Sequence, residues 1–273
     1  MSILDETGQF ESRPLGLPNV SYGPFRLLEA VPWLMLATAC RFIAPPGALG
    51  VVAAHSLSSV CIFLAFLLAA RRMIEFSGAR ASFGKLEFRE QLTLAREVLL
   101  RIAALIVVAS VMGLIVPILL GFPTLSLWVG GSLIWGLDCV AFDSFNIIEK
   151  TWSASLGTMM FLMIVGVRHS MQVSGRISCK VSLSYAVRQF AARVRYMGPG
   201  FLAVLFIQIS LSAVQGSVRG AVLSLLHAAA PALIKKSVYF CFVFGFASVR
   251  LWATLAVLVF AWRLSHRADF QKA

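Results

Sequence analysis

The chain has little charge for its length. Of its 273 residues only 13% are charged and 59% are hydrophobic, whereas a soluble domain carries about 25% charged and about 45–50% apolar residues. This composition excludes a disordered chain and argues against a soluble enzyme. Several apolar runs approach or exceed the roughly 20 residues that a helix needs to cross about 30 Å of hydrocarbon. We therefore expect an all-α, polytopic integral membrane protein.

Acidic residues are scarce, because 12 Asp and Glu stand against 24 Lys and Arg, for a net charge of +12. In a soluble protein this excess would suggest nucleic acid as a partner. Membrane proteins, however, gather basic residues in cytoplasmic loops that face anionic lipid. We therefore expect the lipid bilayer and its anionic cytoplasmic lipids as partners, and no nucleic acid.

The sequence also lacks the motifs of site chemistry. Its five cysteines form no CxxC pair and lie mostly in apolar runs, so neither a disulfide framework nor a zinc site is indicated. There is no Walker A, GxGxxG, GxSxG or HExxH motif, and each of the four histidines is isolated in the sequence. We therefore predict no catalytic residue, no metal and no cofactor, and we favour a non-catalytic protein.

The apolar runs predict about six transmembrane helices in one domain over residues 27–262. Two strong helix terminators, Pro45-Pro46-Gly47 and Gly121-Phe122-Pro123, separate neighbouring runs. The expected spans are at about 27–44, 50–70, 102–120, 201–226 and 238–262, with one further crossing within 124–167. Residues 1–26 are expected to be an irregular cytoplasmic tail, and residues 263–273 a basic cytoplasmic tail.

The stretch 124–167 is ambiguous, because it holds two apolar runs, 124–142 and 152–167, on either side of a polar interruption. If only one run crosses, 18 basic residues lie on the side of the termini and 5 on the other. If both cross, this asymmetry nearly disappears. Since basic residues favour the cytoplasmic side, we predict six spans with both termini cytoplasmic. The sequence leaves open which of the two runs crosses.

Arginine outnumbers lysine by 18 to 6, a bias typical of GC-rich bacterial genomes. We therefore expect a multi-pass protein of the inner (plasma) membrane.

Two cytoplasmic segments look amphipathic. The second half of 71–101 has a helical pattern and is expected to run directly into the third span. The other segment places its apolar residues at heptad-like spacing opposite basic ones. We expect this second segment to be a helix lying on the membrane surface. Its apolar residues are Leu183, Val187, Phe190, Val194 and Met197, and its basic residues are Arg188, Arg193 and Arg195.

Arg250 is the most conspicuous single residue, because it lies near the middle of the run 238–262. An arginine at that depth costs at least about 2.5–3.5 kcal/mol, so it needs a partner or water. The candidate partners are Asp138 and Asp143, of which Asp138 is preferred because it is embedded in an apolar run. Asp138 is also able to meet Arg219. These four residues are the candidates for an ion pair or a substrate contact.

A register of small residues repeats every four positions at Ser212, Gly216, Gly220 and Ser224, and Gly216 to Gly220 is a GxxxG motif. Small residues let helix backbones approach closely in lipid. We therefore expect this face to pack against another helix, within the chain, in a homo-oligomer or against a protein partner.

Three functions fit the sequence. The first is a non-catalytic subunit or scaffold of a membrane complex, indicated by the small-residue face and the lack of site chemistry. The second is a transporter, channel or lipid-handling protein that uses an intramembrane arginine for an anionic substrate. The third is an intramembrane enzyme, for which His169 with Ser170 is the sole local candidate pair.

Overall fold

The computed structural model describes residues 19–20, 27–43, 47–75, 88–143, 146–174, 183–227 and 232–270. Within these residues the chain is helical, apart from one antiparallel pairing of two-residue strands, β1 (Asn19–Val20) and β2 (Ile74–Glu75). The all-α fold class is confirmed. The predicted tail 1–26 lies outside the described residues except for β1.

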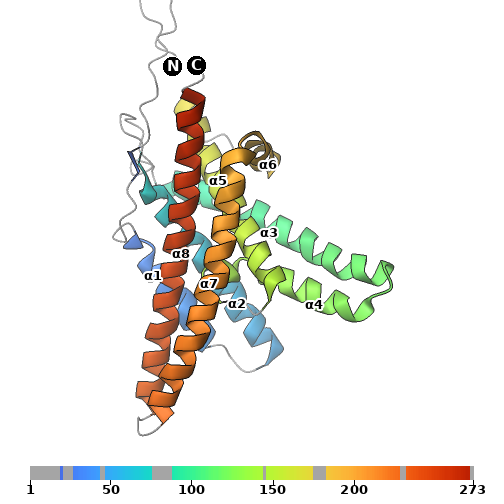
Figure 1. The fold of residues 1–273 in the computed structure, drawn as a ribbon, viewed down its shortest axis with the longest axis vertical. Coiled ribbons are helices and arrows are strands. Elements are labelled where there is room, and N and C mark those ends of the chain that lie inside the picture. Colours follow the sequence, from blue (N-terminus) through green and yellow to red (C-terminus); the bar gives the residue numbers. More distant parts are fainter. Residues whose placement is uncertain are drawn as a thin grey trace, which may run out of the picture.

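Three antiparallel helix pairs make up most of the described chain. Figure 1 shows α7 and α8 side by side as the longest pair, while the pair of α3 and α4 extends to one side, across their direction. The bounds of the pairs are α1 (Val31–Phe42) with α2 (Ala48–Met73), α3 (Phe88–Leu119) with α4 (Pro123–Ile134), and α7 (Val194–His227) with α8 (Ala232–Phe270).

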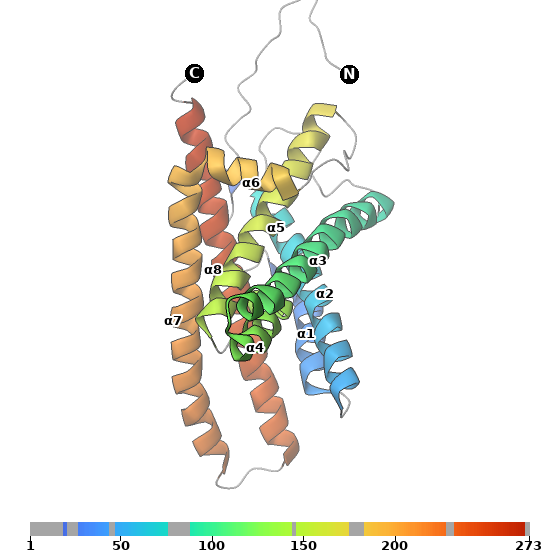
Figure 2. The same cartoon turned by 90° about the vertical axis from the view of Figure 1, so that its right-hand side faces the viewer.

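Two further helices connect these pairs. The helix α5 (Ile147–Ser174) lies between them and contacts a helix of every pair. The short helix α6 (Leu183–Ala192) follows, and a turn at Arg193 separates it from α7. Figure 2 shows α6 lying across the direction of α7, at the end of the molecule where the C-terminus lies.

One glycine of each predicted helix terminator lies where its helix pair reverses direction, whereas Pro45 and Pro46 lie outside the described residues. Gly121 has a φ of +84° and Gly47 a φ of +103°, values in the left-handed region that glycine enters without a Cβ penalty. Pro123 then occupies the first position of α4, where its missing N–H has no intrahelical partner to lose. The sequence signals for these two reversals are therefore confirmed.

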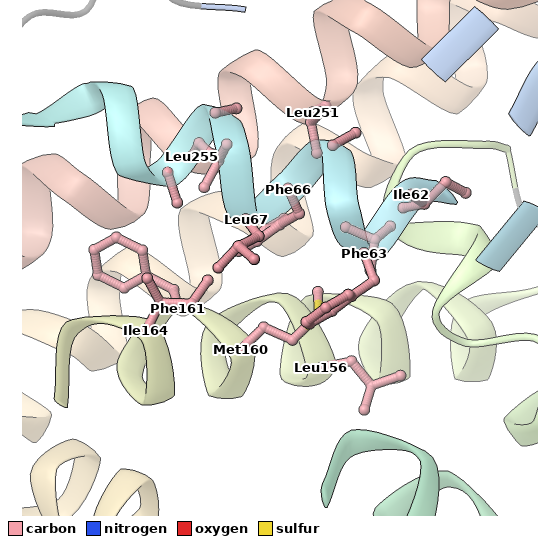
Figure 3. Close-up of a cluster of buried hydrophobic side chains, with 14 of the residues drawn as sticks. Ile62, Phe63, Phe66, Leu67, Leu156, Met160, Phe161, Ile164, Leu251 and Leu255 are labelled. Atoms are coloured by element: carbon pink, nitrogen blue, oxygen red, sulfur yellow. The ribbon is translucent and has the colours of Figure 1, made fainter. Parts of the chain in front are cut away.

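The core lies where α2, α5 and α8 meet. Figure 3 shows Phe63 and Phe66 of α2 opposite Met160 of α5, with Leu251 of α8 beside them. All four side chains are fully buried. This packing fixes the three helices relative to one another, and so it positions the polar residues that they carry nearer the α1–α2 and α7–α8 turns.

Four helices of the described chain are long and apolar enough to cross a membrane, at Leu49–Met73, Ala95–Leu119, Val194–Val222 and Leu233–Ser265. They coincide with the spans expected at 50–70, 102–120, 201–226 and 238–262. The prediction of a helical membrane protein is thus supported, but the number of six spans is not confirmed. The first expected span is occupied by α1, which has 12 residues. Its length of about 18 Å is less than the roughly 30 Å of hydrocarbon in a bilayer.

The ambiguous stretch 124–167 becomes two helices of unequal length. Its first run forms α4, which has 12 residues, and its second run belongs to α5, which has 28. At 1.5 Å per residue α5 rises about 42 Å and α4 about 18 Å. Of the two, α5 is therefore the one with the length to cross, although it is not among the four apolar candidates.

Two helices extend beyond their expected spans. The amphipathic end of the segment 71–101 continues without a break into α3, as predicted. The helix α8 passes the expected end of its span and continues to Phe270, so the expected basic tail begins as helix.

Candidate functional site

A short polar loop between α4 and α5 carries both candidate acids. After α4 ends, a single 3-10 turn, η3 (Asp138–Val140), turns the chain before α5 begins at Ile147. Asp138 opens this turn and Asp143 lies five residues later. The loop lies between the α1–α2 pair and the α7–α8 pair. Asp138 contacts the first pair and Asp143 contacts the second.

Asp138 is held entirely by α1 and α2. Its side chain is fully buried, and its Oδ2 lies 3.0 Å from Nη2 of Arg41 and 3.0 Å from Nδ1 of His55. The hydroxyl of Ser58 donates to its Oδ1 at 2.6 Å. The Arg41 guanidinium thus supplies the opposite charge beside this buried carboxyl group, and His55 and Ser58 complete its polar contacts.

Arg250 is held by the loop and by α7. Its side chain is fully buried, and its Nη2 lies 3.4 Å from Oδ1 of Asp143, whose side chain is 35% exposed. The same Nη2 lies 3.3 Å from the hydroxyl of Ser212 and 3.2 Å from Oε1 of Gln215, while Nη1 donates to the carbonyl of Phe142. Ser212 also donates to Asp143. One guanidinium therefore binds a carboxylate, a carbonyl, a hydroxyl and an amide oxygen.

The preference for Asp138 as the partner of Arg250 is wrong. The carboxylate beside Arg250 is that of Asp143, and Asp138 pairs with Arg41 and His55 instead. Asp138 does not pair with Arg219 either. The physical reason is the turn η3, because it directs Asp138 to the α1–α2 side and leaves Asp143, at the end of the turn, on the α7–α8 side.

A cavity of about 600 Å³ lies beside this loop. Its walls come from the α1–α2 pair, the α7–α8 pair and the loop, and they are partly polar and partly aromatic. They consist of Arg41 and Phe42 of α1, His55 of α2, Phe142 and Asp143 of the loop, Gln215, Gly216 and Arg219 of α7, and Tyr239 and Val243 of α8. The lining residues of α7 and α8 lie near the end of α7 and the start of α8, far from the end of α8 at Phe270, which Figure 1 draws in dark red.

Each cavity arginine lies against an aromatic ring. The guanidinium carbon of Arg41 is 4.3 Å from the centre of the Phe142 ring, and that of Arg219 is 5.6 Å from the centre of the Tyr239 ring. Such cation–π contacts hold a guanidinium in place without neutralising its charge. The donors of both arginines are thus held beside an aromatic surface.

The charges around the cavity do not cancel. Asp138 balances Arg41, and Asp143 balances Arg250, which lies behind the wall. Within the described residues no carboxylate forms an ion pair with Arg219. The cavity therefore carries one positive charge in excess when His55 is neutral. A concave site with excess arginine and part apolar walls suits an anion.

The two glycines of the small-residue register do not pack against another helix within the described chain. A Cβ added at Gly216 or at Gly220 would have no atom within 4 Å. Gly216 lines the cavity, Ser212 belongs to the Arg250 cluster, and Ser224 donates to the carbonyl of Ala221. Packing of this face against a second chain stays a prediction.

The basic residues expected on the membrane surface lie at the α6–α7 bend. Arg188 and Arg195 are exposed, and Arg193 donates to the side chain of Gln189. The apolar face of this segment is only partly buried in the protein, because Met197 is buried whereas Val187 and Val194 are exposed. Exposed apolar residues of this kind are compatible with contact to lipid, as predicted.

Sequence reasoning missed Arg41, His55, Ser58 and Gln215. His55 was interpreted as isolated because no carboxylate lies near it in the sequence, yet its partner Asp138 is 83 residues away. Arg41 lies in the last turn of α1 and was counted as an ordinary residue beyond the membrane. A histidine and an arginine at the ends of apolar runs were the available signals. The side chains of His169 and Ser170 lie outside the described part of the structure.

The chain matches no protein-family model, no curated protein and no solved structure.

Proposed function

We propose that this membrane protein binds an anionic substrate in the cavity between α1, α2, α7 and α8, as the binding step of transport or of lipid handling. The observation that carries the proposal is the excess positive charge of Arg219 in a cavity of about 600 Å³. Ligand pockets have volumes of about 300–1,000 Å³. If the termini are cytoplasmic, as the basic residues predict, this cavity belongs to the outer half of the membrane.

The walls indicate the chemistry of the ligand. Arg41 and Arg219 supply donors for an anionic group, while Phe42, Phe142 and Tyr239 supply apolar surface. A ligand with one anionic group on an apolar body satisfies both kinds of wall. A lipid headgroup with its chains and a small amphiphilic anion share this chemistry.

Binding of benzenesulfonate to the detergent-purified protein tests the proposal, because its charge is constant near neutral pH. We expect Arg219→Gln to weaken binding about tenfold or more, since a hydrogen bond to a charged group contributes about 1.5–3 kcal/mol. Arg195→Gln is the matched control, because Arg195 is exposed at the other end of α7. Equal affinity in the wild type and in Arg219→Gln, or an equal loss in both variants, contradicts the proposal.

The source of the anion is distinguished by lipid analysis of the same preparations. If the ligand is a lipid, the wild type retains anionic lipid that benzenesulfonate displaces and that Arg219→Gln retains less well. If the ligand is a soluble anion, benzenesulfonate binds with the same dependence on Arg219 while the lipid content is equal in both proteins.

A second candidate function is that of a subunit in a membrane complex. It is supported by the open surface at Gly220, where an added Cβ meets nothing within 4 Å. Close helix packing in lipid uses glycines of this kind. If α7 contacts a second chain there, Gly220→Leu will dissociate a complex that survives mild detergent, whereas Gly245→Leu on α8, also in open space, will not. An unchanged complex in Gly220→Leu excludes this contact.

A further inference from the structure

His55 is placed between the cavity and a buried carboxylate. Its side chain is 25% exposed, it lines the cavity, and its Nδ1 lies 3.0 Å from Oδ2 of Asp138. The ring centre lies 4.8 Å from that of Trp135, which holds one side of the imidazole. Nδ1 is therefore the ring nitrogen that contacts Asp138, and the imidazole is also part of the cavity wall.

The contact with Asp138 decides which nitrogen carries the hydrogen. Asp138 accepts from the Arg41 guanidinium and the Ser58 hydroxyl, and a carboxylate paired with a guanidinium offers acceptor atoms only. Nδ1 must then be the donor, and in the neutral ring Nε2 carries a lone pair. A proton that arrives from the cavity is thus received at Nε2, and it converts this atom from an acceptor into a charged donor.

We propose that the cavity takes up a proton together with its anion, and that Nε2 of His55 receives the proton. This inference rests on the proposed anion site and names how that site is regulated. The proton comes from hydronium or a buffer acid in the solvent; as the N–H bond forms at Nε2, the bond between that donor and its proton breaks and leaves water or the buffer base. The bound anion and the imidazolium then stabilise each other through their opposite charges.

The other charged and titratable groups around His55 come from every element that meets at the cavity. Asp138 and Arg41 balance each other, and Asp143 is engaged by Arg250. Among the described residues that line the cavity, Arg219 forms no ion pair with a carboxylate, and protonation of His55 raises the excess from one positive charge to two. The charged and titratable groups that line the cavity with His55 are Arg41 of α1, Asp143 of the loop, Arg219 of α7 and Tyr239 of α8. Behind this lining lie Asp138 and Arg250, both fully buried, and Cys40 of α1, which interacts electrostatically with Asp138.

The sign of the linkage follows from these charges. An anion in the cavity favours the charged imidazole, so binding draws a proton from solution; by reciprocity, a lower pH strengthens binding. Where the imidazole is neutral, the anion binds to the weaker site. For one linked proton the affinity changes by at most about tenfold per pH unit. Coupling between two bound ligands typically changes the affinity for each of them by about 5- to 150-fold.

Benzenesulfonate binding measured from pH 6.0 to 8.5 tests the inference, because the charge of this probe does not change over the range. We expect the affinity of the wild type to rise about 5- to 150-fold toward pH 6.0, and to become independent of pH in His55→Gln. Calorimetry of the wild type in buffers of different ionisation enthalpy gives the proton count directly, and we expect up to one proton taken up per probe bound. Arg195→Gln should behave as the wild type.

Each outcome decides one of the two proposals. Binding that depends on pH in the wild type and not in His55→Gln, with proton uptake, supports the inference. Binding without pH dependence or proton uptake overturns the inference and leaves the anion site standing. A pH dependence that persists in His55→Gln overturns the assignment to His55. If His55→Gln does not fold, the proton count of the wild type decides. No binding at any pH overturns the anion site itself.

Discussion

Arg250 carries a charge inside a candidate membrane span, and its polar contacts show how the fold accommodates this charge. Its side chain is fully buried, and it binds Asp143, the Phe142 carbonyl, Ser212 and Gln215. Because it lies behind the cavity wall rather than in it, we assign it to positioning the loop. The anion site then depends on Arg250 only through the placement of Asp143 and Phe142.

The first prediction concerns stability. Arg250→Leu should lower the free energy of unfolding by about 1–3 kcal/mol, because it leaves the carboxylate and the carbonyl without their donor. The loss should stay below that of a fully buried pair, since Asp143 is 35% exposed and can be hydrated. Thermal unfolding in detergent measures the effect. The double variant Arg250→Leu, Asp143→Asn should recover part of the loss. A stable Arg250→Leu protein that has lost benzenesulfonate binding would contradict this assignment.

Only part of the site could be predicted from the sequence. Arg250 and the two aspartates stand out because charge inside an apolar run requires compensation, and the structure does bring them to one region. Their pairing could not be predicted, because it depends on the direction in which one turn of three residues, η3, sends the chain. The contact of His55 with Asp138 spans 83 positions, and no local pattern indicates it.

At the scale of elements, the pair α3–α4 depends on close approach at two glycines. A Cβ at Gly130 would lie 2.5 Å from Cγ of Leu114, and one at Gly113 would lie 2.8 Å from Cδ1 of Leu133. The hydroxyl of Ser126 donates to the carbonyl of Leu114 at 2.7 Å. Backbones that approach this closely gain van der Waals packing, which is the main attraction between helices in lipid.

The second prediction tests this packing with neighbouring glycines. Gly130→Ala should lower the free energy of unfolding by about 1–3 kcal/mol, because Leu114 must leave its rotamer or the helices must separate. Gly131→Ala is the matched control, since a Cβ there meets nothing within 4 Å, and it should be neutral or stabilising by up to about 1 kcal/mol through helix propensity. Thermal unfolding of both variants measures the difference. Equal unfolding temperatures would show that α3 and α4 are not packed as described.

The third prediction concerns the basic helix α6 and its bend into α7. Replacing Arg188, Arg193 and Arg195 together by Glu should weaken seating on the membrane or invert the local topology, because each basic residue near an anionic surface contributes about 1 kcal/mol. The same three positions changed to Lys keep the charge and serve as the control. Protease accessibility in sealed vesicles measures the orientation. Unchanged orientation and expression of the Glu variant would show that packing alone holds this segment.

The boundaries of most elements follow from local chemistry. Glycine and proline end α3 and start α4 where the sequence predicts, because both residues act on the backbone of their own turn. The lengths of α1 and α5 were harder to predict from the sequence. An apolar run of 18 residues from position 27 contains a helix of only 12 residues, since the run begins in a turn and Pro32 sets the helix start.

At the scale of the whole molecule, the topology stays a prediction. Four helices have the length and composition of spans, and the basic residues predict cytoplasmic termini. Cys179 lies outside the described residues, in a segment expected to be cytoplasmic. Labelling by an impermeant thiol reagent should therefore miss Cys179 in intact cells and reach it after lysis. A variant in which the other four cysteines are replaced ensures that any labelling comes from Cys179. Labelling from outside would exclude this orientation.

The central claim is that the cavity between α1, α2, α7 and α8 holds an anion. The most direct test is an experimental structure with 4-iodobenzenesulfonate, in which anomalous scattering locates the iodine. The account predicts one site in the cavity, with the sulfonate against Arg41 and Arg219 and the iodinated ring beside Phe42 or Tyr239. An iodine located only elsewhere on the protein, with the cavity arginines contacting no sulfonate, would contradict it.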